Sequence, residues 1–268
     1  MTQAIPLGKR NASFQVLQSL RANRNNRHRE KRFIVEGVKP LKQLQENAWP
    51  IASLLVREGA LSPWARQFVE SVAPAELYAV SPELWAELSS KDENSEVLAV
   101  AVLPELPASA LSLVKDGVYV IADRPNSPGN LGSLIRTAEA FGAQAVITYG
   151  HAADPFDQKC ISASIGALFS LPLAHIETGE GFKAWAESFK AAGVPVQVLA
   201  LDEKGDVDCG ALELKGASIV VVGNETDGLS KIFKEHCDVK VRIKMKGKAT
   251  SLNAACSGSI LLYELLAR

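Results

Sequence analysis

Three glycine-containing loops in the second half of this 268-residue chain carry the side chains best suited to chemistry. They cover residues 127–138 (SPGNLGSLIRTA), 222–229 (VGNETDGL) and 243–253 (IKMKGKATSLN). Each follows a predicted strand, and open α/β sheets bind ligands at the carboxyl ends of their strands. None contains the dinucleotide fingerprint G-x-G-x-x-G or the phosphate loop G-x-x-x-x-G-K-[ST]. The loops therefore predict a ligand site of another kind only when they are taken together, because an ordinary strand–turn–helix connection is the better interpretation of each one alone.

The elements that must position these loops can be read from the apolar runs around them. Continuous apolar runs predict buried strands at 117–122, 145–149, 196–201, 218–222 and 239–243. Between them, helices are predicted at 131–141, 162–169, 182–192, 229–237 and 251–266. Asn130 is placed to cap the first of these helices and Gly142 to end it. Apolar strands that alternate with helices indicate a parallel sheet covered on both faces.

The first half of the chain has shorter elements. Strands are predicted at 32–37, 51–57, 76–80 and 97–102, and helices at 11–24, 40–47, 63–71 and 82–88. This alternation predicts a compact α/β domain of about 100 residues. The stretch 103–111 (LPELPASAL) contains two prolines and predicts a linker. We therefore expect two domains, at residues 1–104 and 105–268.

Basic residues are concentrated near the N-terminus. Residues 9–32 carry a net charge of +7, although the whole chain carries −1. Such asymmetry favours a polyanion partner, because lysines and arginines beside phosphates release condensed counterions. A solvated basic helix face is an equally good interpretation of the charge alone. The candidate RNA-binding residues are Lys9, Arg10, Arg21, Arg24, Arg27, Arg29 and Arg32.

Composition excludes several classes of protein. With 47% hydrophobic and 22% charged residues the chain is typical of a folded globular protein. No apolar run is long enough to span a membrane, and the N-terminus lacks the apolar stretch of a signal peptide. The four cysteines form no C-x-x-C pair, and the four histidines show no metal spacing. We therefore expect a cytoplasmic protein with neither a membrane segment nor a bound metal.

Taken together and in order, the three loops resemble the signature motifs of the SpoU group of SPOUT RNA methyltransferases. Those motifs are N-P-G-N-x-G-x-x-x-R-T-A, then G-N/S-E-x-x-G-L, then I-P-M-x-G-x-x-x-S-L-N-V-S. The resemblance covers residues 117–268. In addition, KRFIVEG (31–37) resembles the ribosomal-protein-like substrate-binding domain often found ahead of the SpoU domain.

The resemblance implies a fold and an activity. The fold is an α/β protein whose C-terminal parallel-sheet domain contains a trefoil knot, preceded by a smaller α/β domain. The activity is S-adenosylmethionine-dependent 2′-O-methylation of a ribose in structured RNA, and we favour ribosomal RNA. The family works as a homodimer.

The resemblance also assigns roles to individual residues. The implied cofactor-binding residues are Gly223, Asn224, Glu225, Gly228, Leu229, Ile243, Met245 and Leu252. The implied catalytic residues are Arg136, Asn130, Glu225, Ser251 and Asn253. A guanidinium is a poor base because its pKa exceeds about 12. We therefore expect Arg136 to grip the phosphate beside the target ribose and to lower the pKa of the hydroxyl, the alternative being a surface salt bridge.

Some positions depart from the family pattern. Lys244 stands in place of the usual proline, and Ala254 and Ala255 in place of Val-Ser. Ser162 stands where many relatives carry arginine. Three alternatives stay open: an RNA- or ribosome-binding factor without turnover, a transfer-RNA methyltransferase, and an enzyme with another nucleotide cofactor. The sequence leaves the methylated nucleotide, the proton acceptor and any link to antibiotic resistance undetermined.

Overall fold

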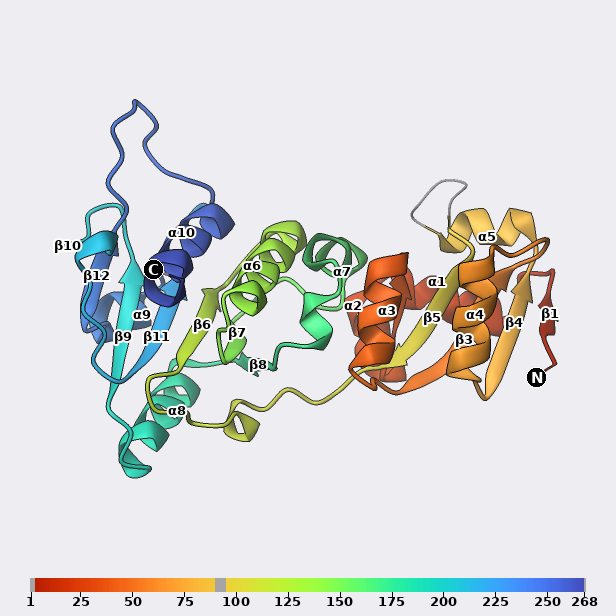
Figure 1. Ribbon diagram of the computed structural model, residues 1–268, viewed down its shortest axis with the longest axis horizontal. Coiled ribbons are helices and arrows are strands. Elements are labelled where there is room, and N and C mark those ends of the chain that lie inside the picture. Colours follow the sequence, from red (N-terminus) through yellow and green to blue (C-terminus); the bar gives the residue numbers. More distant parts are fainter. Residues whose placement is uncertain (1–2, 90–94, 268) are drawn as a thin grey trace. The chain divides into compact units, whose positions relative to one another are not determined.

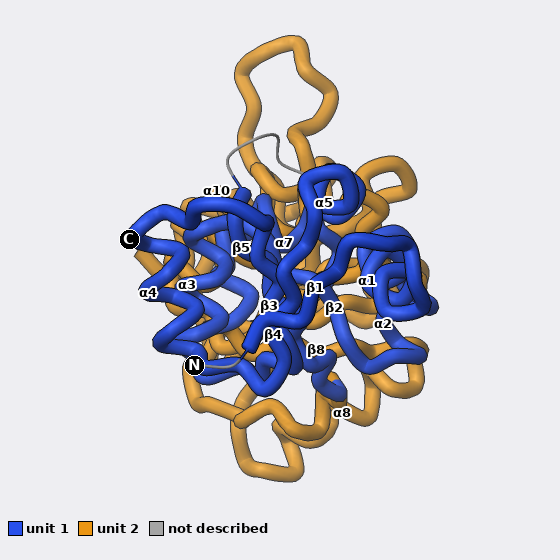
Figure 2. The backbone as a smooth tube through the Cα atoms, turned by 90° about the vertical axis from the view of Figure 1, so that its right-hand side faces the viewer, with its two compact units in different colours: residues 1–105, 156–169 blue, residues 106–155, 170–268 orange. Residues whose placement is uncertain are grey.

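The computed structural model describes residues 3–89 and 95–267. The chain forms two compact units, residues 1–105 with 156–169 (unit 1) and residues 106–155 with 170–268 (unit 2) (Figure 2). Unit 1 thus takes in a segment from the second half of the sequence. The functional division at residue 104 stays a prediction.

Unit 1 is a five-stranded mixed sheet with helices packed around it (Figure 1). The strand order is β1-β4-β3-β5-β2, in which β5 runs antiparallel to both of its neighbours. The strands are β1 (Ile5–Leu7), β2 (Arg32–Glu36), β3 (Ile51–Arg57), β4 (Glu76–Val80) and β5 (Val97–Val102). The helices are α1 (Ala12–Ala22), α2 (Arg24–Glu30), α3 (Val38–Glu46), α4 (Pro63–Val72), α5 (Pro82–Leu88), α7 (Gln158–Ser164) and the 3₁₀ turn η2 (Ala167–Phe169).

The predicted N-terminal helix is present but shorter than expected. Asn11 caps α1, and Phe14, Leu17 and Leu20 form its buried face at helical spacing. The helix ends at Ala22 rather than at residue 24, because Asn23 is extended and its side chain caps the separate helix α2.

Aromatic packing explains why residues 156–169 belong to unit 1. Phe156 lies 4.6 Å from Phe33, and Phe169 lies 5.1 Å from Trp49, measured between ring centroids. The Trp49 indole N–H also donates a 2.9 Å hydrogen bond to the carbonyl of Phe169. Pairs of this kind each contribute about 0.5–1.5 kcal/mol beyond the area that they bury. The helix predicted at 162–169 is accordingly wrong in its bounds, since α7 ends at Ser164 and a 3₁₀ turn follows.

Unit 2 is built on a seven-stranded sheet in which every pairing is parallel, as predicted. The strand order is β10-β12-β9-β11-β6-β7-β8. The strands are β6 (Val118–Asp123), β7 (Ala145–Tyr149), β8 (Leu173–Ile176), β9 (Val196–Leu201), β10 (Val207–Asp208), β11 (Ala217–Val222) and β12 (Val239–Arg242). The helices are α6 (Pro128–Ala140), α8 (Gly179–Ala191), α9 (Lys231–His236) and α10 (Ala254–Leu266), with 3₁₀ turns η1 (Ala108–Ala110) and η3 (Cys209–Ala211).

Helices cover both faces of this sheet. Tyr119 and Ile121 of β6 pack in one cluster with aromatic residues of α8 and α9. On the other face α10 lies beside α6 (Figure 1), and its Gly258 leaves no room for a Cβ, which would lie 2.6 Å from Leu134. Adjacent residues of a strand point to opposite faces, so central strands covered on both sides are apolar throughout.

The topology brings the three loops together. The chain adds β7 and β8 on one side of β6 and then crosses to place β9, β11 and β12 on the other. The loops after β6 and β11 therefore meet at the switch point of a parallel sheet, where ligands bind. Two predicted helix starts are corrected. Ser127, not Asn130, caps α6, which begins at Pro128. The last helix, α10, begins at Ala254 rather than at residue 251, and Asn253 caps it.

Candidate cofactor and RNA site

A cavity of about 400 Å³ lies between the loops at the carboxyl ends of β9, β11 and β12 in unit 2. All eight predicted cofactor-binding residues line it: Gly223, Asn224, Glu225, Gly228, Leu229, Ile243, Met245 and Leu252. Ser251, one of the predicted catalytic residues, also lines it. This volume falls within the range of sites for small molecules.

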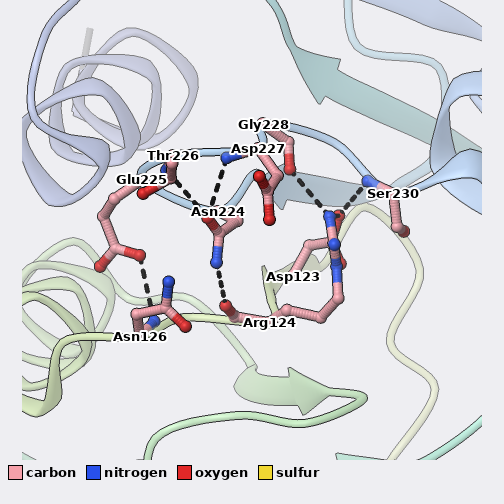
Figure 3. A network of polar contacts seen from close by, with 9 residues as sticks. All are labelled: Asp123, Arg124, Asn126, Asn224, Glu225, Thr226, Asp227, Gly228 and Ser230. Atoms are coloured by element: carbon pink, nitrogen blue, oxygen red, sulfur yellow. Dashed lines mark hydrogen bonds and ion pairs between the residues drawn. The ribbon is translucent and has the colours of Figure 1, made fainter.

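The turn 224–228 after β11 is held rigidly by Asn224, which is buried (Figure 3). Its side-chain oxygen accepts hydrogen bonds from the backbone N–H groups of Thr226 at 2.8 Å and Asp227 at 3.0 Å. Its amide donates to the carbonyl of Arg124 at 2.6 Å, and its backbone pairs with that of Gly228. Because the Asn224 side chain bonds both its own turn and the backbone next to the end of β6, it fixes the position of a turn that lines the cavity.

Asp123 and Arg124 at the end of β6 form a second anchor, which was not predicted from the sequence. Asp123 is fully buried and accepts hydrogen bonds from the Arg124 guanidinium and from the Ser230 backbone N–H (Figure 3). The guanidinium also donates a 3.0 Å bond to the carbonyl of Gly228. The hydrogen bond to Asp123 raises the pKa of Arg124 above its ordinary value. The only sequence signal was an ionisable Asp-Arg pair directly after an apolar strand.

A chain of polar side chains joins the three loops. The Asn253 amide donates to the Asn130 oxygen at 3.1 Å, and the Asn130 amide donates to Glu225 Oε1 at 2.9 Å. Glu225 also accepts from the backbone N–H groups of Asn126 at 3.0 Å and Ser127 at 3.4 Å. Burial alone would raise the pKa of Glu225, but these hydrogen bonds outweigh it and hold the pKa below its ordinary value. Glu225 is therefore an ionised carboxylate that ties one loop to another.

We expect Glu225→Gln to lower the melting temperature of the protein at pH 7 by roughly 2 °C, because the amide replaces an acceptor of three N–H groups. Because the folded protein holds the pKa of Glu225 below the ordinary value of 4.5, the ionised carboxylate stabilises the fold at any pH above 4.5. This stabilisation is lost as the pH falls through the pKa that Glu225 has in the folded protein. The difference in melting temperature between Glu225→Gln and the wild type should therefore become smaller below pH 4.5. Thermal unfolding at several pH values measures it, with the exposed Glu213→Gln as control. A difference that does not change with pH would contradict the ionised assignment.

Arg136 lies on α6 and is exposed. Within residues 3–89 and 95–267 it makes no hydrogen bond or ion pair, so the surface salt bridge considered from the sequence is absent from this part of the chain. It is not among the residues that line the cavity. Its guanidinium is thus available to a ligand outside the cofactor cavity.

The charges around the cavity favour a cationic ligand. Four acidic residues line it (Asp202, Glu203, Glu225 and Asp227), against one basic residue, Lys234. Asp202 and Glu203, directly after β9, were not predicted as site residues. Apolar side chains supply the remaining walls, and among them Met245 and Leu252 are 36% and 39% exposed. A ligand with positive charge and an apolar portion matches this lining.

The predicted RNA-binding arginines differ in their surroundings. Arg27 is 3% exposed and donates to the carbonyl of Leu20 at 2.9 Å, so its assignment to an RNA-binding surface is wrong. Arg21 donates to backbone carbonyls at the end of α5, and Arg10 pairs with Glu87. Lys9, Arg29 and Arg32 are exposed, and Arg24 is half-buried. A periodic basic run does not reveal which of its members point inward.

Two features are absent from residues 3–89 and 95–267. No group of three or more histidine, cysteine, aspartate or glutamate side chains is arranged to hold a metal ion. No helix among residues 3–89 and 95–267 is long and apolar enough to cross a membrane.

Comparison with known proteins gives concordant matches. The family model described as SpoU rRNA methylase matches residues 117–263, and that of the SpoU L30e-like domain matches residues 11–99. The 23S rRNA (uridine(2479)-2′-O)-methyltransferase of Streptomyces viridochromogenes is 41% identical over 95% of this chain and 89% of its own length. The 23S rRNA (guanosine(2553)-2′-O)-methyltransferase RlmP of Bacillus subtilis is 25% identical over 87% of this chain and 88% of its own length.

Solved structures agree with these matches. The SpoU methyltransferase AviRb from Streptomyces viridochromogenes, in complex with the cofactor AdoMet, has a TM-score of 0.91 at 41% identity and covers 96% of this chain and 98% of its own. An AdoMet-bound rRNA methyltransferase from Sinorhizobium meliloti has a TM-score of 0.86 at 27% identity, with 98% of each chain covered.

Proposed function

Because this chain belongs to the SpoU rRNA methylase family, we propose that it methylates a ribose 2′-hydroxyl of 23S ribosomal RNA. It is an RNA ribose 2′-O-methyltransferase that uses S-adenosylmethionine, as predicted. Its fold is the predicted one, a knotted parallel-sheet domain with a smaller α/β domain ahead of it. The ribosomal RNA of the large subunit is the substrate class named for both curated relatives, and we propose the same class here.

One observation carries the proposal: the second and third motif loops line a single cavity, and the Asn253–Asn130–Glu225 chain ties the first motif loop to both of them. The residues present fit S-adenosylmethionine, because its ammonium and sulfonium charges match the acidic lining and its adenine matches the apolar walls. When bound, S-adenosylmethionine supplies an electrophilic methyl group on sulfur. The task of the protein is then to orient the ribose and to assist loss of its proton.

Among the proposed catalytic residues, Arg136 acts on the RNA. Its exposed guanidinium, which has no ion-pair partner among the residues that the structure describes, grips the phosphate beside the target ribose through a charge-assisted hydrogen bond and favours the ionised hydroxyl. The hydrogen bond between Asn130 and Glu225 fixes the first and second motif loops relative to each other. Ser251, at the edge of the cavity, offers a hydroxyl to the ribose, and Asn253 holds the start of α10.

We propose that unit 1 binds the body of the RNA through exposed cations. Lys9, Arg29 and Arg32 remain candidates because they face solvent, whereas Arg27 does not. Contacts of this kind are made to phosphates, so they add affinity and salt dependence rather than sequence preference. We propose the cytoplasm as the place where the enzyme meets ribosomal RNA.

A homodimer is proposed from the outer face of α10. Ile260 and Tyr263, one helical turn apart, are 37% and 50% exposed, and the Tyr263 ring lies 5.8 Å from the ring of Phe141, the residue directly after α6. Exposed apolar residues on one helix face are typical of the core of a subunit interface. In the dimer the partner completes the site that Arg136 serves.

Ile260→Asp should therefore give a monomer with methyl transfer reduced at least about tenfold, because a charge at an apolar interface costs at least about 1.4 kcal/mol. Light scattering coupled to gel filtration measures the mass. The matched control is Val16→Asp, which alters an apolar residue that is also 37% exposed but lies on α1 of unit 1. A dimeric, active Ile260→Asp protein would rule out this interface.

The function itself is tested by incubating the protein with radiolabelled S-adenosylmethionine and each of three substrates: 23S ribosomal RNA, 16S ribosomal RNA and bulk transfer RNA. We expect label only in 23S RNA, with one primer-extension stop at low nucleotide concentration. Label in transfer RNA alone would favour the transfer-RNA alternative. Binding of RNA without label transfer, and without S-adenosylmethionine binding in calorimetry, would identify a binding factor instead.

A further inference from the structure

Unit 1 contains a second cavity, of about 560 Å³, that the proposed function does not use. It is lined by the start of α3, the start of α4, the start of β5 and the end of α7. The residues that matter for its chemistry are Val38, Lys39, Ser62, Trp64 and Glu96. The cavity is large enough for a nucleobase, and it is polar at one side and aromatic at another.

Trp64 offers a preorganised stacking surface. Its indole lies half-buried at the first turn of α4 and stacks on Phe68 with ring centroids 5.4 Å apart and planes 19° from parallel. The contact with Phe68 fixes the plane of the indole before any ligand binds. Unpaired RNA bases stack on aromatic side chains in this way, since every base has a π face.

Glu96 offers a fixed pair of acceptors. One carboxylate oxygen accepts the Ser62 backbone N–H at 3.1 Å and the other accepts the Ser62 hydroxyl at 2.5 Å. These bonds orient the carboxylate and occupy one acceptor position on each oxygen. An ionised carboxylate has about four such positions, so both oxygens can still accept a hydrogen bond from a ligand.

The start of α3 supplies donors and positive charge. Gly37 caps the helix without a side chain, so the backbone N–H groups of Val38 and Lys39 receive no capping side chain. Lys39 lines the cavity, and Lys42, one turn further along the same helix, is also exposed. Both ammonium groups are placed to meet the phosphates of an RNA strand that enters here.

We propose that this cavity binds an unpaired guanine base of the RNA substrate, outside the methylated nucleotide. The Watson–Crick edge of guanine carries two adjacent N–H donors beside a carbonyl acceptor. The Glu96 carboxylate complements the donors, and the N–H groups at the start of α3 complement the carbonyl. Adenine, cytosine and uracil each present only one N–H donor group on that edge. The inference rests on the proposed function, because it takes RNA as the ligand.

The test uses the full-length protein and fluorescein-labelled eight-nucleotide RNAs, namely oligouridine and the same strand with one central guanosine, adenosine or cytidine. Fluorescence anisotropy should show that the guanosine strand binds at least about tenfold more tightly than the others. Glu96→Gln should abolish this preference, and Trp64→Ala should weaken binding of every strand about tenfold. Glu70→Gln, an exposed glutamate on α4 outside the cavity, is the matched control and should bind as wild type.

A second measurement locates the base. The central guanosine is replaced by photoreactive 6-thioguanosine, and the cross-linked peptide is identified by mass spectrometry. Cross-links to residues 38–42 or 62–66 are expected. Equal affinity for all strands, a preference that survives Glu96→Gln, or cross-links only in unit 2 would each overturn the proposal.

Titration of the same variants with S-adenosylmethionine separates the two proposals. All of them should bind the cofactor as wild type does, because the cavity lies in unit 1 and the cofactor loops lie in unit 2. If the protein selects guanosine but binds no S-adenosylmethionine, the proposed methyltransferase function is wrong and the proposed guanine site in unit 1 stands. If the protein binds S-adenosylmethionine without selecting guanosine, the guanine site is wrong and the methyltransferase function stands.

Discussion

Arg136→Ala is expected to reduce the rate of methyl transfer by about 10²- to 10³-fold while S-adenosylmethionine binds unchanged. The side chain is exposed on α6, makes no ion pair among the described residues and does not line the cofactor cavity, so its removal alters neither fold nor cofactor site. The loss reflects the missing stabilisation of negative charge on the ribose oxygen and the phosphate, and removal of one such donor typically costs this much. Single-turnover kinetics with saturating RNA measures the chemical step.

Two further variants make the result specific to Arg136. Arg136→Lys keeps the positive charge but loses the planar pair of donors, so we expect it to recover only part of the rate. Lys183→Ala removes an exposed cation from α8 of the same unit and should leave the rate unchanged. Full activity in Arg136→Ala would contradict the role proposed for this residue.

Gly223→Ala should weaken S-adenosylmethionine binding about 5- to 150-fold. A Cβ at residue 223 would lie 2.8 Å from the backbone of both Gly228 and Leu229. Backbone atoms cannot yield as a flexible side chain can, so the turn after β11 must shift. Forced overpacking of this kind costs about 1–3 kcal/mol, which corresponds to that range of affinities. Calorimetric titration measures the dissociation constant.

The matched control is Gly247→Ala in the third loop, where an added Cβ would meet nothing within 4 Å. We expect it to bind S-adenosylmethionine as wild type does. Thermal unfolding of both variants separates a local shift of the turn from loss of the fold. Unchanged affinity of Gly223→Ala for S-adenosylmethionine would show that cofactor binding does not depend on the close contact between Gly223 and the backbone of Gly228 and Leu229.

Much of the site could be predicted because its signals are local in the sequence. A glycine, an asparagine and a carboxylate at fixed spacing after an apolar strand indicate a turn at the edge of the sheet where ligands bind, and the resemblance to the SpoU motifs assigned the cofactor to that turn. The eight predicted cofactor-binding residues accordingly line one cavity. Helix caps were predicted less well. Both Ser127 and Asn130 are residue types that cap helices. In the structure the Ser127 hydroxyl accepts the Asn130 backbone N–H, and the Asn130 side chain bonds Glu225 and Asn253 of the other loops instead.

Charge patterns were a weaker guide than loop motifs. The basic run near the N-terminus indicated a polyanion partner, but Arg27 turned out to be buried, with its guanidinium donating to backbone carbonyls. A sequence shows how many cations a segment has, whereas packing decides which of them reach solvent. The Asp123–Arg124 anchor was missed for the same reason, since its partners Gly228 and Ser230 are more than 100 residues away.

The sequence by itself determined that both halves are α/β and that the second half contains a parallel sheet, because strand and helix periodicity and turn residues act over a few neighbouring positions. The three loops were identified through their resemblance to the SpoU motifs. Only the tertiary structure decided that residues 156–169 pack with unit 1, where Phe156 and Phe169 complete an aromatic cluster around Phe33 and Trp49. It also decided that Asn130 bridges Glu225 and Asn253, which lie 95 and 123 positions away along the chain. Contacts at such separations depend on how the sheet orders its strands, and no local pattern carries that information.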